Sequence, residues 1–397
     1  MASDQLPIAP ITERLALLGG ARWEVHFNAR RRVATGEDII ELTIGEPDVP
    51  TPVELIDVAN QSMRAGRTGY ASGQGEPELL KAVAAKYSRR TGREILPEQV
   101  LIFPGTQAAL AMCLMAMVGE GDAVLVPDPY YATYESVVRA TGADFVPVAM
   151  SASNGFCLTV EQLQEAMVPN AKVLLLNSPH NPTGSVLDRQ AVSEIAAFCR
   201  ANNMWILSDE VYEDLIYGKP FVSAFDMAEF AECTIATSSI SKSHAAPGFR
   251  SGWAVGPAWF IERALPVAES FLFGNQPFIA DMTAHALNNP DQTAATMAEK
   301  YQHRIDLLLK AFAAVPQSGL VPLRPESGMF MLVDVSATGK SGAEFAEMLL
   351  DFGVAVMPGS SFGDQAGDFI RLSLTVADED LQRAAERILN CAMKIQV

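Results

Sequence analysis

Basic residues are scarce in this 397-residue sequence, which has 29 lysines and arginines against 47 aspartates and glutamates. The formal net charge at pH 7 is therefore −18. A chain this acidic repels phosphate backbones and anionic lipid headgroups. We therefore expect neither nucleic acid nor a membrane surface as a partner.

Long hydrophobic runs are also missing. The longest uninterrupted apolar stretch covers residues 108–118, which is too short for the roughly 20 residues of a membrane-spanning helix. The first ten residues, MASDQLPIAP, lack the basic residues and the apolar run of a secretion signal. The sequence thus predicts a soluble protein that is not exported.

Cysteine is sparse, with five residues, an odd number, and no Cys-x-x-Cys pair among them. This pattern favours neither a disulfide framework nor a zinc site, and we expect no bound metal. It indicates a reducing, cytoplasmic location. The cysteines are Cys113, Cys157, Cys199, Cys233 and Cys391.

Hydrophobic residues make up 49% of the sequence and charged residues 19%, as in a folded protein of two or three domains. Seven short runs rich in Val, Ile and Leu alternate with segments long enough for a helix. Such runs are typical of strands buried on both faces of a parallel sheet. We therefore predict a large three-layer α/β/α domain with a mainly parallel seven-stranded sheet. The predicted strands are residues 100–103, 123–126, 145–148, 173–176, 204–207, 234–237 and 253–255.

The pattern of apolar and charged residues changes after residue 290. A long charged helix is predicted over residues 294–314, and an alternating apolar run follows at residues 329–335. This mixture indicates a second, smaller α+β domain. The first 45 residues are too few for a domain of their own, so we assign residues 1–45 and 291–397 to the small domain. Residues 46–290 then form the large domain.

A lysine among small hydroxylated residues follows one of the predicted strands. The sequence there is Thr-Ser-Ser-Ile-Ser-Lys, ending at Lys242, and Arg250 lies eight residues further on. Hydroxyl groups and a guanidinium together form a cradle for a phosphate group. The alternative is a serine-rich surface loop that holds two unrelated cations.

Three other predicted strands also end in polar loops, where an open α/β sheet binds its ligands. Asn181 lies in the loop Asn-Ser-Pro-His-Asn-Pro-Thr-Gly, which is either a site or a plain turn. Asp209 follows another strand, and its alternative role is to cap a helix. Gly105 and Thr106 begin an apolar helix, whose free amide groups would bind an anion.

Taken together, these motifs resemble the signature of the class I aminotransferases, pyridoxal-phosphate enzymes of fold type I. The matching residues are Asn-Pro-Thr-Gly from Asn181, Asp-x-x-Tyr from Asp209, Ser-x-Ser-Lys ending at Lys242, and Arg250. The resemblance extends over nearly the whole chain. Gly-Glu-Pro-Asp from Gly45 resembles the family's substrate loop, and residues 369–373 resemble its carboxylate-binding strand.

The resemblance implies a catalytic role for several of these residues. Lys242 would hold the cofactor aldehyde as a Schiff base and later move a proton as acid and base. Asp209 would keep the pyridine nitrogen protonated, so that the ring acts as an electron sink. Tyr212 and Asn181 would bind the ring oxygen and thereby lower the pKa of the Schiff base.

The family likeness also implies how the cofactor and the substrate are held. Tyr131 would stack on the ring; the alternative is a core aromatic without a role in the site. Arg371 would bind the substrate α-carboxylate with a bidentate fork, beside Gly45 and Asn181. Tyr70 would reach the phosphate of a neighbouring subunit, which requires a homodimer. The phosphate would be held by Ser239, Ser241, Arg250, Gly105 and Thr106.

These expectations describe a cytoplasmic, homodimeric aminotransferase that works in two half-reactions on an amino acid and a 2-oxo acid. Another pyridoxal-phosphate reaction on the same fold, such as β-elimination or decarboxylation, is the nearest alternative. A cofactor-binding regulator without activity is a more remote one, because the acidic chain shows no helix-turn-helix in its first 45 residues. The donor stays open among aspartate, aromatic, arginine and alanine types; some relatives have a lysine at the place of Thr106, which would suit a dicarboxylate.

Overall fold

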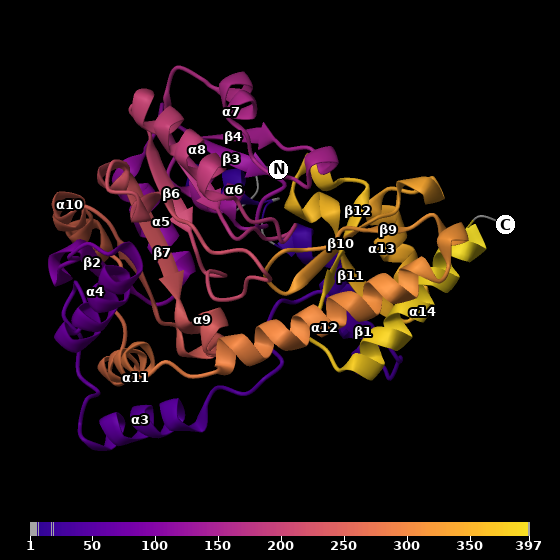
Figure 1. Ribbon diagram of the computed structural model, residues 1–397, viewed down its shortest axis with the longest axis horizontal. Coiled ribbons are helices and arrows are strands. Elements are labelled where there is room, and N and C mark those ends of the chain that lie inside the picture. Colours follow the sequence, from indigo (N-terminus) through magenta and orange to yellow (C-terminus); the bar gives the residue numbers. More distant parts are fainter. Residues whose placement is uncertain (1–5, 7, 17, 19, 396–397) are drawn as a thin grey trace.

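The computed structural model describes residues 6, 8–16, 18 and 20–395, which form two sheets surrounded by helices. Figure 1 shows the larger sheet and its helices at one end of the molecule and the smaller sheet at the other. The long helix α12 (Thr293–Ala313) extends from beside α9 (Ile240–Ser243) into the smaller part. The predicted α/β fold with a smaller second domain is confirmed.

The larger sheet has seven strands in the order β2-β8-β7-β6-β5-β3-β4. Neighbouring strands are parallel except around β8, which is antiparallel to both β2 and β7. The prediction of a mainly parallel seven-stranded sheet is therefore confirmed. The strands are β2 (Val100–Phe103), β3 (Ala123–Asp128), β4 (Asp144–Ala149), β5 (Ala171–Asn177), β6 (Trp205–Asp209), β7 (Thr234–Ser239) and β8 (Gly252–Val255).

Helices cover both faces of this sheet, because successive side chains of each strand point to opposite sides. In β2, Leu101 and Phe103 pack into one core, while Val100 and Ile102 pack into another. This is the reason that the strands read as unbroken apolar runs. One face carries α5 (Thr106–Met117), α6 (Tyr134–Ala140) and α10 (Ala258–Glu269). The other carries α4 (Pro77–Thr91), α7 (Val160–Ala166), α8 (Arg189–Ala201) and α11 (Pro277–Asn288), with α3 (Val53–Arg64) packed on α11.

Local sequence signals set the ends of several helices. At the start of α8, the Asp188 carboxylate accepts a hydrogen bond of 2.9 Å from the amide of Ala191. Thr159 and Gln162 form a reciprocal capping box at the start of α7. Helix α4 ends at Gly92, whose φ of 69° lies in the left-handed region that glycine adopts without strain.

The smaller sheet has five strands in the order β1-β11-β12-β10-β9. Strand β1 is parallel to β11, and the other pairs are antiparallel. A strand from the N-terminal part of the chain thus completes a sheet built from the C-terminal part; the domain boundaries at residues 46 and 290 stay a prediction. The strands are β1 (Ile40–Leu42), β9 (Val321–Pro322), β10 (Phe330–Asp334), β11 (Val354–Pro358) and β12 (Phe369–Ser373).

Amphipathic helices pack on the smaller sheet. In α14 (Asp378–Ile395), Leu381, Ala385, Ile388 and Ala392 recur at intervals of three or four residues, and all four are buried. The other helices of this part are α2 (Glu24–Ala34), α12 and α13 (Gly342–Asp351), and a short helix α1 (Pro10–Leu15) lies near α6.

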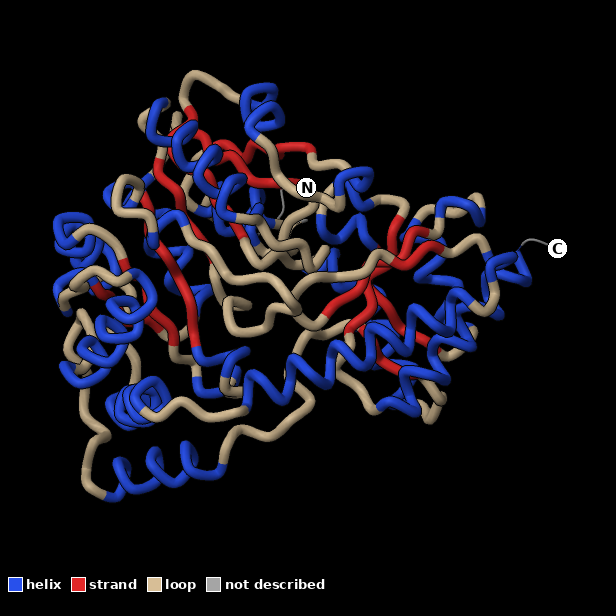
Figure 2. The backbone as a smooth tube through the Cα atoms, viewed as in Figure 1, coloured by secondary structure: helices blue, strands red, loops and turns tan. Residues whose placement is uncertain are grey.

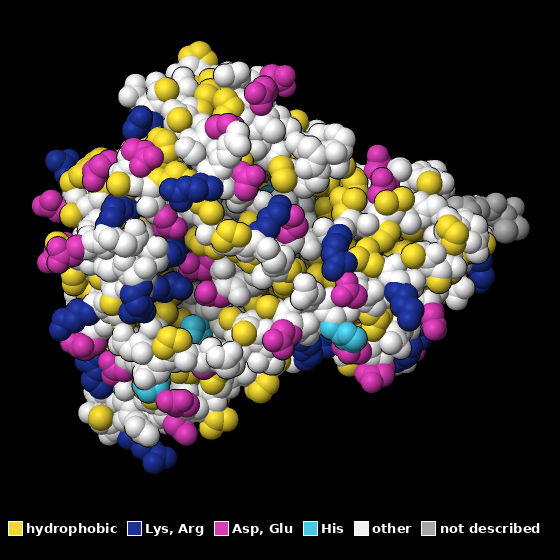
Figure 3. Space-filling view, viewed as in Figure 1, with side chains coloured by type: hydrophobic (Ala, Val, Ile, Leu, Met, Phe, Trp, Pro, Cys, Tyr) yellow, Lys and Arg dark blue, Asp and Glu magenta, His cyan; other side chains and the backbone are white. Residues whose placement is uncertain are grey.

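Loops occupy the centre of the molecule, between the strands of the two sheets (Figure 2). Within the described residues, no helix is long and apolar enough to cross a membrane. On the face drawn in Figure 3, Lys and Arg side chains lie scattered among Asp and Glu side chains.

Candidate active site

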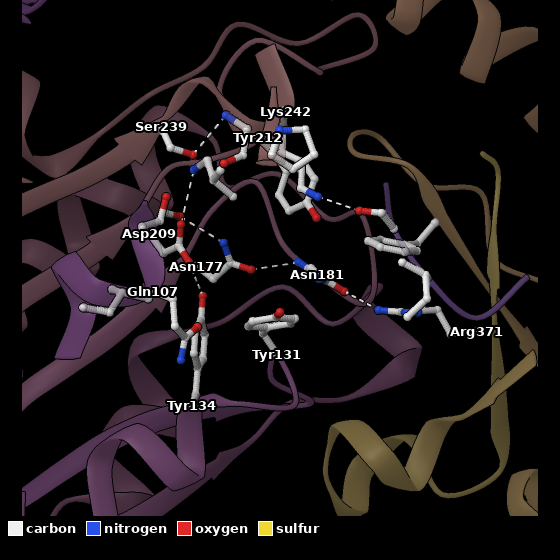
Figure 4. Close-up of a pocket in the computed structure, with 18 of the residues that line it drawn as sticks. Gln107, Tyr131, Tyr134, Asn177, Asn181, Asp209, Tyr212, Ser239, Lys242 and Arg371 are labelled. Carbon is white, nitrogen blue, oxygen red and sulfur yellow. Dashed lines mark hydrogen bonds between the residues drawn. The ribbon is translucent and has the colours of Figure 1, made fainter. Parts of the chain in front are cut away.

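A pocket with a volume of about 310 Å³ lies where the carboxyl ends of β5, β6 and β7 face the smaller sheet. Residues from both sheets line it, and Figure 4 shows their side chains pointing toward one another. The structure thereby brings together eleven residues that the sequence predicted for the site. They are Gly45, Thr106, Tyr131, Asn181, Asp209, Tyr212, Ser239, Ser241, Lys242, Arg250 and Arg371.

Two predicted residues lie outside the pocket wall. Gly105 adjoins it, since a Cβ atom on Gly105 would lie 2.3 Å from Nη2 of Arg250. A side chain at that position would displace the guanidinium, so the close approach requires glycine. Tyr70 lies on the surface with 96% of its side chain exposed, and its ring contacts Phe273 at a centroid distance of 6.1 Å.

Asp209 is the last residue of β6, and its carboxylate points into the pocket (Figure 4). The Tyr134 hydroxyl donates a hydrogen bond of 2.7 Å to Oδ2, and the Val211 amide donates one of 3.3 Å to Oδ1. Burial raises the pKa of Asp209 to about 6, although both hydrogen bonds oppose this shift. A turn rather than a helix follows Asp209, so the alternative reading of Asp209 as a helix cap is wrong.

Lys242 lies in the four-residue helix α9, directly after β7. Its Nζ atom donates a hydrogen bond of 2.5 Å to the carbonyl oxygen of Gly45. Burial lowers the pKa of Lys242 to about 8; the carboxylate of Glu46 opposes this shift, and the cations of Arg371 and Arg250 support it. The site therefore holds an amine that loses its proton far more readily than a surface lysine.

Hydroxyl groups, a guanidinium and a helix start meet at one end of the pocket. Helix α5 begins at Thr106, whose buried Oγ1 atom has no hydrogen-bond partner in the described structure. The amide of Ser241 donates to the Ser239 hydroxyl at 3.3 Å. Arg250 has a φ of 53° in the left-handed region, and its guanidinium lies beside Gly105. A helix N-terminus with adjacent hydroxyls and a cation forms an anion site.

At the other end of the pocket, the Arg371 guanidinium projects from β12 and is 1% exposed. It donates hydrogen bonds to Oδ1 of Asn181 (3.1 Å) and to the carbonyl oxygen of Thr43 (2.7 Å). It lies between the rings of Phe330 and Phe362, with ring centroids 3.9 and 4.3 Å from Cζ. Burial lowers the pKa of Arg371 to about 10, so the group stays charged at neutral pH. Within the described part of the chain Arg371 forms no ion pair, and its Nε atom has no partner.

Aromatic rings form the floor between these two ends. Tyr131 lines the pocket, with its ring edge-to-face against Tyr134 at 5.6 Å. Tyr212 is buried and packs edge-to-face with Phe330 at 6.5 Å. Burial raises the pKa of the Tyr212 hydroxyl well above its ordinary value, so this group acts as a neutral hydrogen-bond donor.

The sequence did not predict several residues that complete the pocket. Tyr134 follows the predicted Tyr131 by three positions, but nothing local indicated that its hydroxyl would reach Asp209. Asn177 could have been predicted from the sequence, because it is a polar residue at the end of β5, just as Asp209 is at the end of β6. Its Nδ2 atom donates a hydrogen bond of 2.9 Å to the backbone carbonyl of Asp209, and its Oδ1 atom accepts one of 2.8 Å from the backbone amide of Asn181. Further lining residues that were missed are Trp23, Ile44, Gln107, Leu110, Val211, Pro247 and Phe330.

The pocket combines four functional groups in a fixed order. An anion cradle lies at one end, and a guanidinium without a carboxylate partner lies at the other. A buried carboxylate and an amine of lowered pKa lie between them. Such a site can hold a phosphate, form a carbon–nitrogen bond at the lysine and orient a carboxylate substrate.

Comparison with known proteins agrees with this chemistry. The family described as aminotransferase class I and II matches residues 37–388. The arginine–pyruvate transaminase AruH of Pseudomonas aeruginosa is 40% identical over 97% of this chain and 98% of its own. The aspartate/prephenate aminotransferase of Thermus thermophilus is 34% identical over 89% of this chain and 90% of its own.

Solved structures of the same kind share the fold. The Thermus thermophilus aspartate aminotransferase with maleate superposes with a TM-score of 0.91 and 31% identity, covering 98% of this chain and all of that one. An aromatic aminotransferase from Pyrococcus horikoshii superposes with a TM-score of 0.86 and 30% identity, covering 93% of this chain and 99% of that one. The chain therefore belongs to the class I and II aminotransferases, enzymes of fold type I that move an amino group between amino acids and oxo acids.

Proposed function

We propose that the protein moves the α-amino group of an L-amino acid to a 2-oxo acid in two half-reactions, with pyridoxal phosphate as its cofactor. One observation carries the proposal: the buried amine of Lys242 shares a pocket with the carboxylate of Asp209 and the guanidinium of Arg371. The three groups correspond to the three needs of the reaction, which are a nucleophile, a partner for a cationic ring and a carboxylate clamp.

The residues present fit this cofactor. The cradle end has a buried hydroxyl without a partner on Thr106, and Gly105 leaves room beside Arg250. Ser239 and Ser241 add hydroxyls to the same cradle. When bound, pyridoxal phosphate supplies an aldehyde that takes the amino group and a ring that withdraws electrons from the substrate α-carbon.

The other pocket residues hold the ring and the substrate in this proposal. Asp209 keeps a proton on the ring nitrogen, and Tyr134 and Asn177 fix its carboxylate and its carbonyl oxygen respectively. Tyr131 packs against the ring face. Tyr212 and Asn181 donate hydrogen bonds to the ring oxygen. The side-chain nitrogen Nδ2 of Asn181 is suited to this, because the side-chain oxygen Oδ1 already binds Arg371.

Lys242 holds and moves the proton at the substrate α-carbon. With a pKa of about 8, roughly a tenth of this amine is unprotonated at pH 7, against less than about a thousandth for a lysine of ordinary pKa. The Gly45 carbonyl fixes the direction of the amine at 2.5 Å. The family assignment favours amino-group transfer over the lyase and decarboxylase alternatives, which would use the same lysine.

Reduction with borohydride should fix the pyridoxyl group on Lys242 when the cofactor-loaded protein is treated and its peptides are mapped. The physical reason is that Lys242 lies in the pocket and has a lowered pKa. Lys219, whose exposed amine is paired with Glu326, provides an internal control and should stay unlabelled. The Lys242→Arg variant should carry no label, and a label on any other lysine would contradict the assignment.

We also propose that the protein is a homodimer in which Tyr70 reaches the phosphate cradle of the neighbouring subunit. Its support here is the surface position of Tyr70, whose ring contacts the exposed ring of Phe273, with a further exposed aromatic, Phe271, two residues before Phe273. Light scattering should give about twice the chain mass of 42.7 kDa. Tyr70→Phe should release the cofactor faster without lowering that mass. A monomer that retains full cofactor affinity would exclude this arrangement.

The donor amino acid and the cytoplasmic location are separate questions. The relatives named above are named for arginine–pyruvate, aspartate/prephenate, aspartate or aromatic substrates, and the sequence also allowed alanine-type donors. The cytoplasmic location stays a prediction.

A further inference from the structure

Trp23 forms a wall of the pocket that none of the roles above uses. It ends the short 3-10 turn Gly20–Trp23 and packs against the buried side chains of Ala132, Met357 and Phe362. Ala132 belongs to the larger part of the molecule, and the other two belong to the smaller part. The indole therefore lies at the junction of the two parts, on the pocket surface.

The neighbouring residue Arg22 holds Trp23 in this position. Its guanidinium pairs with Glu135 of α6 and donates a hydrogen bond of 3.1 Å to the Ala132 carbonyl. Its own carbonyl accepts a hydrogen bond of 2.8 Å from the Ser361 hydroxyl. The turn is thus attached to both parts of the molecule, which fixes an aromatic surface beside the substrate carboxylate site.

The pocket surface near Arg371 is largely apolar. Phe330 stacks on the Arg371 guanidinium with its ring centroid 3.9 Å from Cζ, and Ile44 and Tyr131 line the same cavity. On the opposite side of the pocket from Arg371, Gln107 adds a neutral amide, whose oxygen accepts a hydrogen bond of 3.0 Å from Thr133 (Figure 4). A substrate held by Arg371 would therefore meet mainly rings and aliphatic groups.

The charged side chains that line the pocket already have a role in the proposed function. The described lining residues include four charged side chains, and the proposed function uses each of them: Asp209, Lys242, Arg250 and Arg371. Close to Trp23, Glu135 is neutralised on both oxygens by Arg22 and Arg139. Among the described lining residues, a charged substrate side chain would find no partner that the proposed function leaves free, and such an unpaired charge is costly where it is desolvated. Glu46, the exposed residue after Gly45 whose charge acts on Lys242, lies outside this lining.

In the subunit surface proposed around Tyr70, the cation nearest to Tyr70 in the sequence is already paired. Arg67 is three residues from Tyr70, and it binds Glu76 at 2.7 Å and Asp281 at 2.8 Å. A neighbouring copy that presents this surface to the pocket would bring the aromatic side chains of Tyr70, Phe271 and Phe273. Both surfaces are therefore suited to the same kind of ligand.

We propose that the donor amino acid has an uncharged, apolar side chain, aliphatic or aromatic, and that Trp23 is the residue that selects it. This inference rests on the proposed function, because it places the α-carboxylate on Arg371. It distinguishes the protein from relatives named for arginine or aspartate. The selection follows from burial of apolar surface against the indole and from the cost of an unpaired charge.

Binding of carboxylates that lack an amino group tests the proposal without turnover. The cofactor-loaded protein is titrated with 3-phenylpropanoate, 4-methylpentanoate, maleate and 5-guanidinopentanoate, and the cofactor absorbance reports binding. The two apolar acids should bind at least about tenfold more tightly than maleate or the guanidino acid. Tighter binding of either charged acid would overturn the proposal.

The Trp23→Ala variant separates selection from general damage. This variant should bind 3-phenylpropanoate about tenfold or more weakly than the wild type does. Its affinity for propanoate, which is too short to reach the indole, should stay nearly unchanged. Trp259→Ala is the matched control, since Trp259 is half exposed on α10 and does not line the pocket. Equal weakening of both acids in Trp23→Ala would show that Trp23 does not select the side chain.

A donor panel distinguishes failure of this inference from failure of the proposed function. Leucine, phenylalanine, aspartate and arginine are each mixed with the loaded protein, and the oxo acid formed is measured. If only aspartate or arginine gives an oxo acid, the proposal of an apolar donor is wrong, while the proposed transamination still holds. If no donor reacts, the proposed function fails, while the ranking of the four carboxylates still reports on the pocket.

Discussion

Asp209→Asn is expected to lose about 3 kcal/mol or more of transition-state stabilisation, which is more than about a hundredfold in kcat/KM. The reason is that an amide cannot hold a proton on the ring nitrogen, so the ring withdraws electrons less strongly. Asn is nearly isosteric with Asp: its Oδ1 can still accept from the Val211 amide, and its Nδ2 would donate to the Tyr134 hydroxyl in place of accepting from it. Single-turnover kinetics with a reactive donor would measure the loss.

Two controls separate this electronic role from a structural one. Tyr134→Phe removes the hydroxyl that binds Oδ2 but keeps the carboxylate, so its loss should be clearly smaller. In addition, Asp209 has a pKa of about 6 in the cofactor-free pocket, because burial disfavours its charged form. Its carboxylate is therefore charged above that pH, and wild-type affinity for the cofactor should rise through pH 6 more steeply than that of Asp209→Asn. Wild-type turnover in a folded Asp209→Asn protein would contradict the assignment.

Arg371→Lys should weaken amino-acid binding by roughly 1.5–3 kcal/mol, the size of a charge-assisted hydrogen bond. Lysine keeps the positive charge but loses the planar fork that binds a carboxylate with two parallel hydrogen bonds. The Arg371 Nε atom, which has no partner within the described structure, is one of the donors that the variant removes. Titration of the cofactor absorbance with the substrate would give the affinity directly.

Cofactor affinity should stay unchanged in Arg371→Lys, because the phosphate cradle lies at the opposite end of the pocket. Arg324→Lys is a matched control, since Arg324 is an exposed arginine of the same part of the molecule, paired with Asp306 at 2.7 Å. Loss of the cofactor, or unchanged substrate affinity, would mean that Arg371 has another role.

Arg371 also connects the two parts of the molecule. It projects from β12 of the smaller sheet, and its hydrogen bond of 3.1 Å reaches Asn181, in the loop after β5 of the larger sheet. A substrate carboxylate bound to this guanidinium would add a further contact at the same junction. We therefore expect substrate binding to favour the closed arrangement of the two sheets.

Patterns of apolar and polar residues are enough to predict the larger sheet and the residues that follow its strands. Strands buried on both faces favour apolar side chains at successive positions, so β5 and most of β6 are visible as apolar runs, while β7 mixes Ile and Ala with small hydroxylated residues. Ligand groups gather at the carboxyl ends of parallel strands. The positions of Asp209 and Lys242 at a common site could therefore be predicted from their place after such runs.

Which distant residues complete that site depends on how the segments of the chain pack together. Tyr134 binds Asp209 across 75 positions of sequence, and Gly45 meets Lys242 across 197 positions. Trp23 reaches the pocket because Arg22 pairs with Glu135, 113 positions away. Local patterns of hydrophobicity and turn residues report only the path of each segment. Contacts between segments depend on how helices and sheets pack, and the lowered pKa of Lys242 and the raised pKa of Asp209 depend on that packing, because both result from burial.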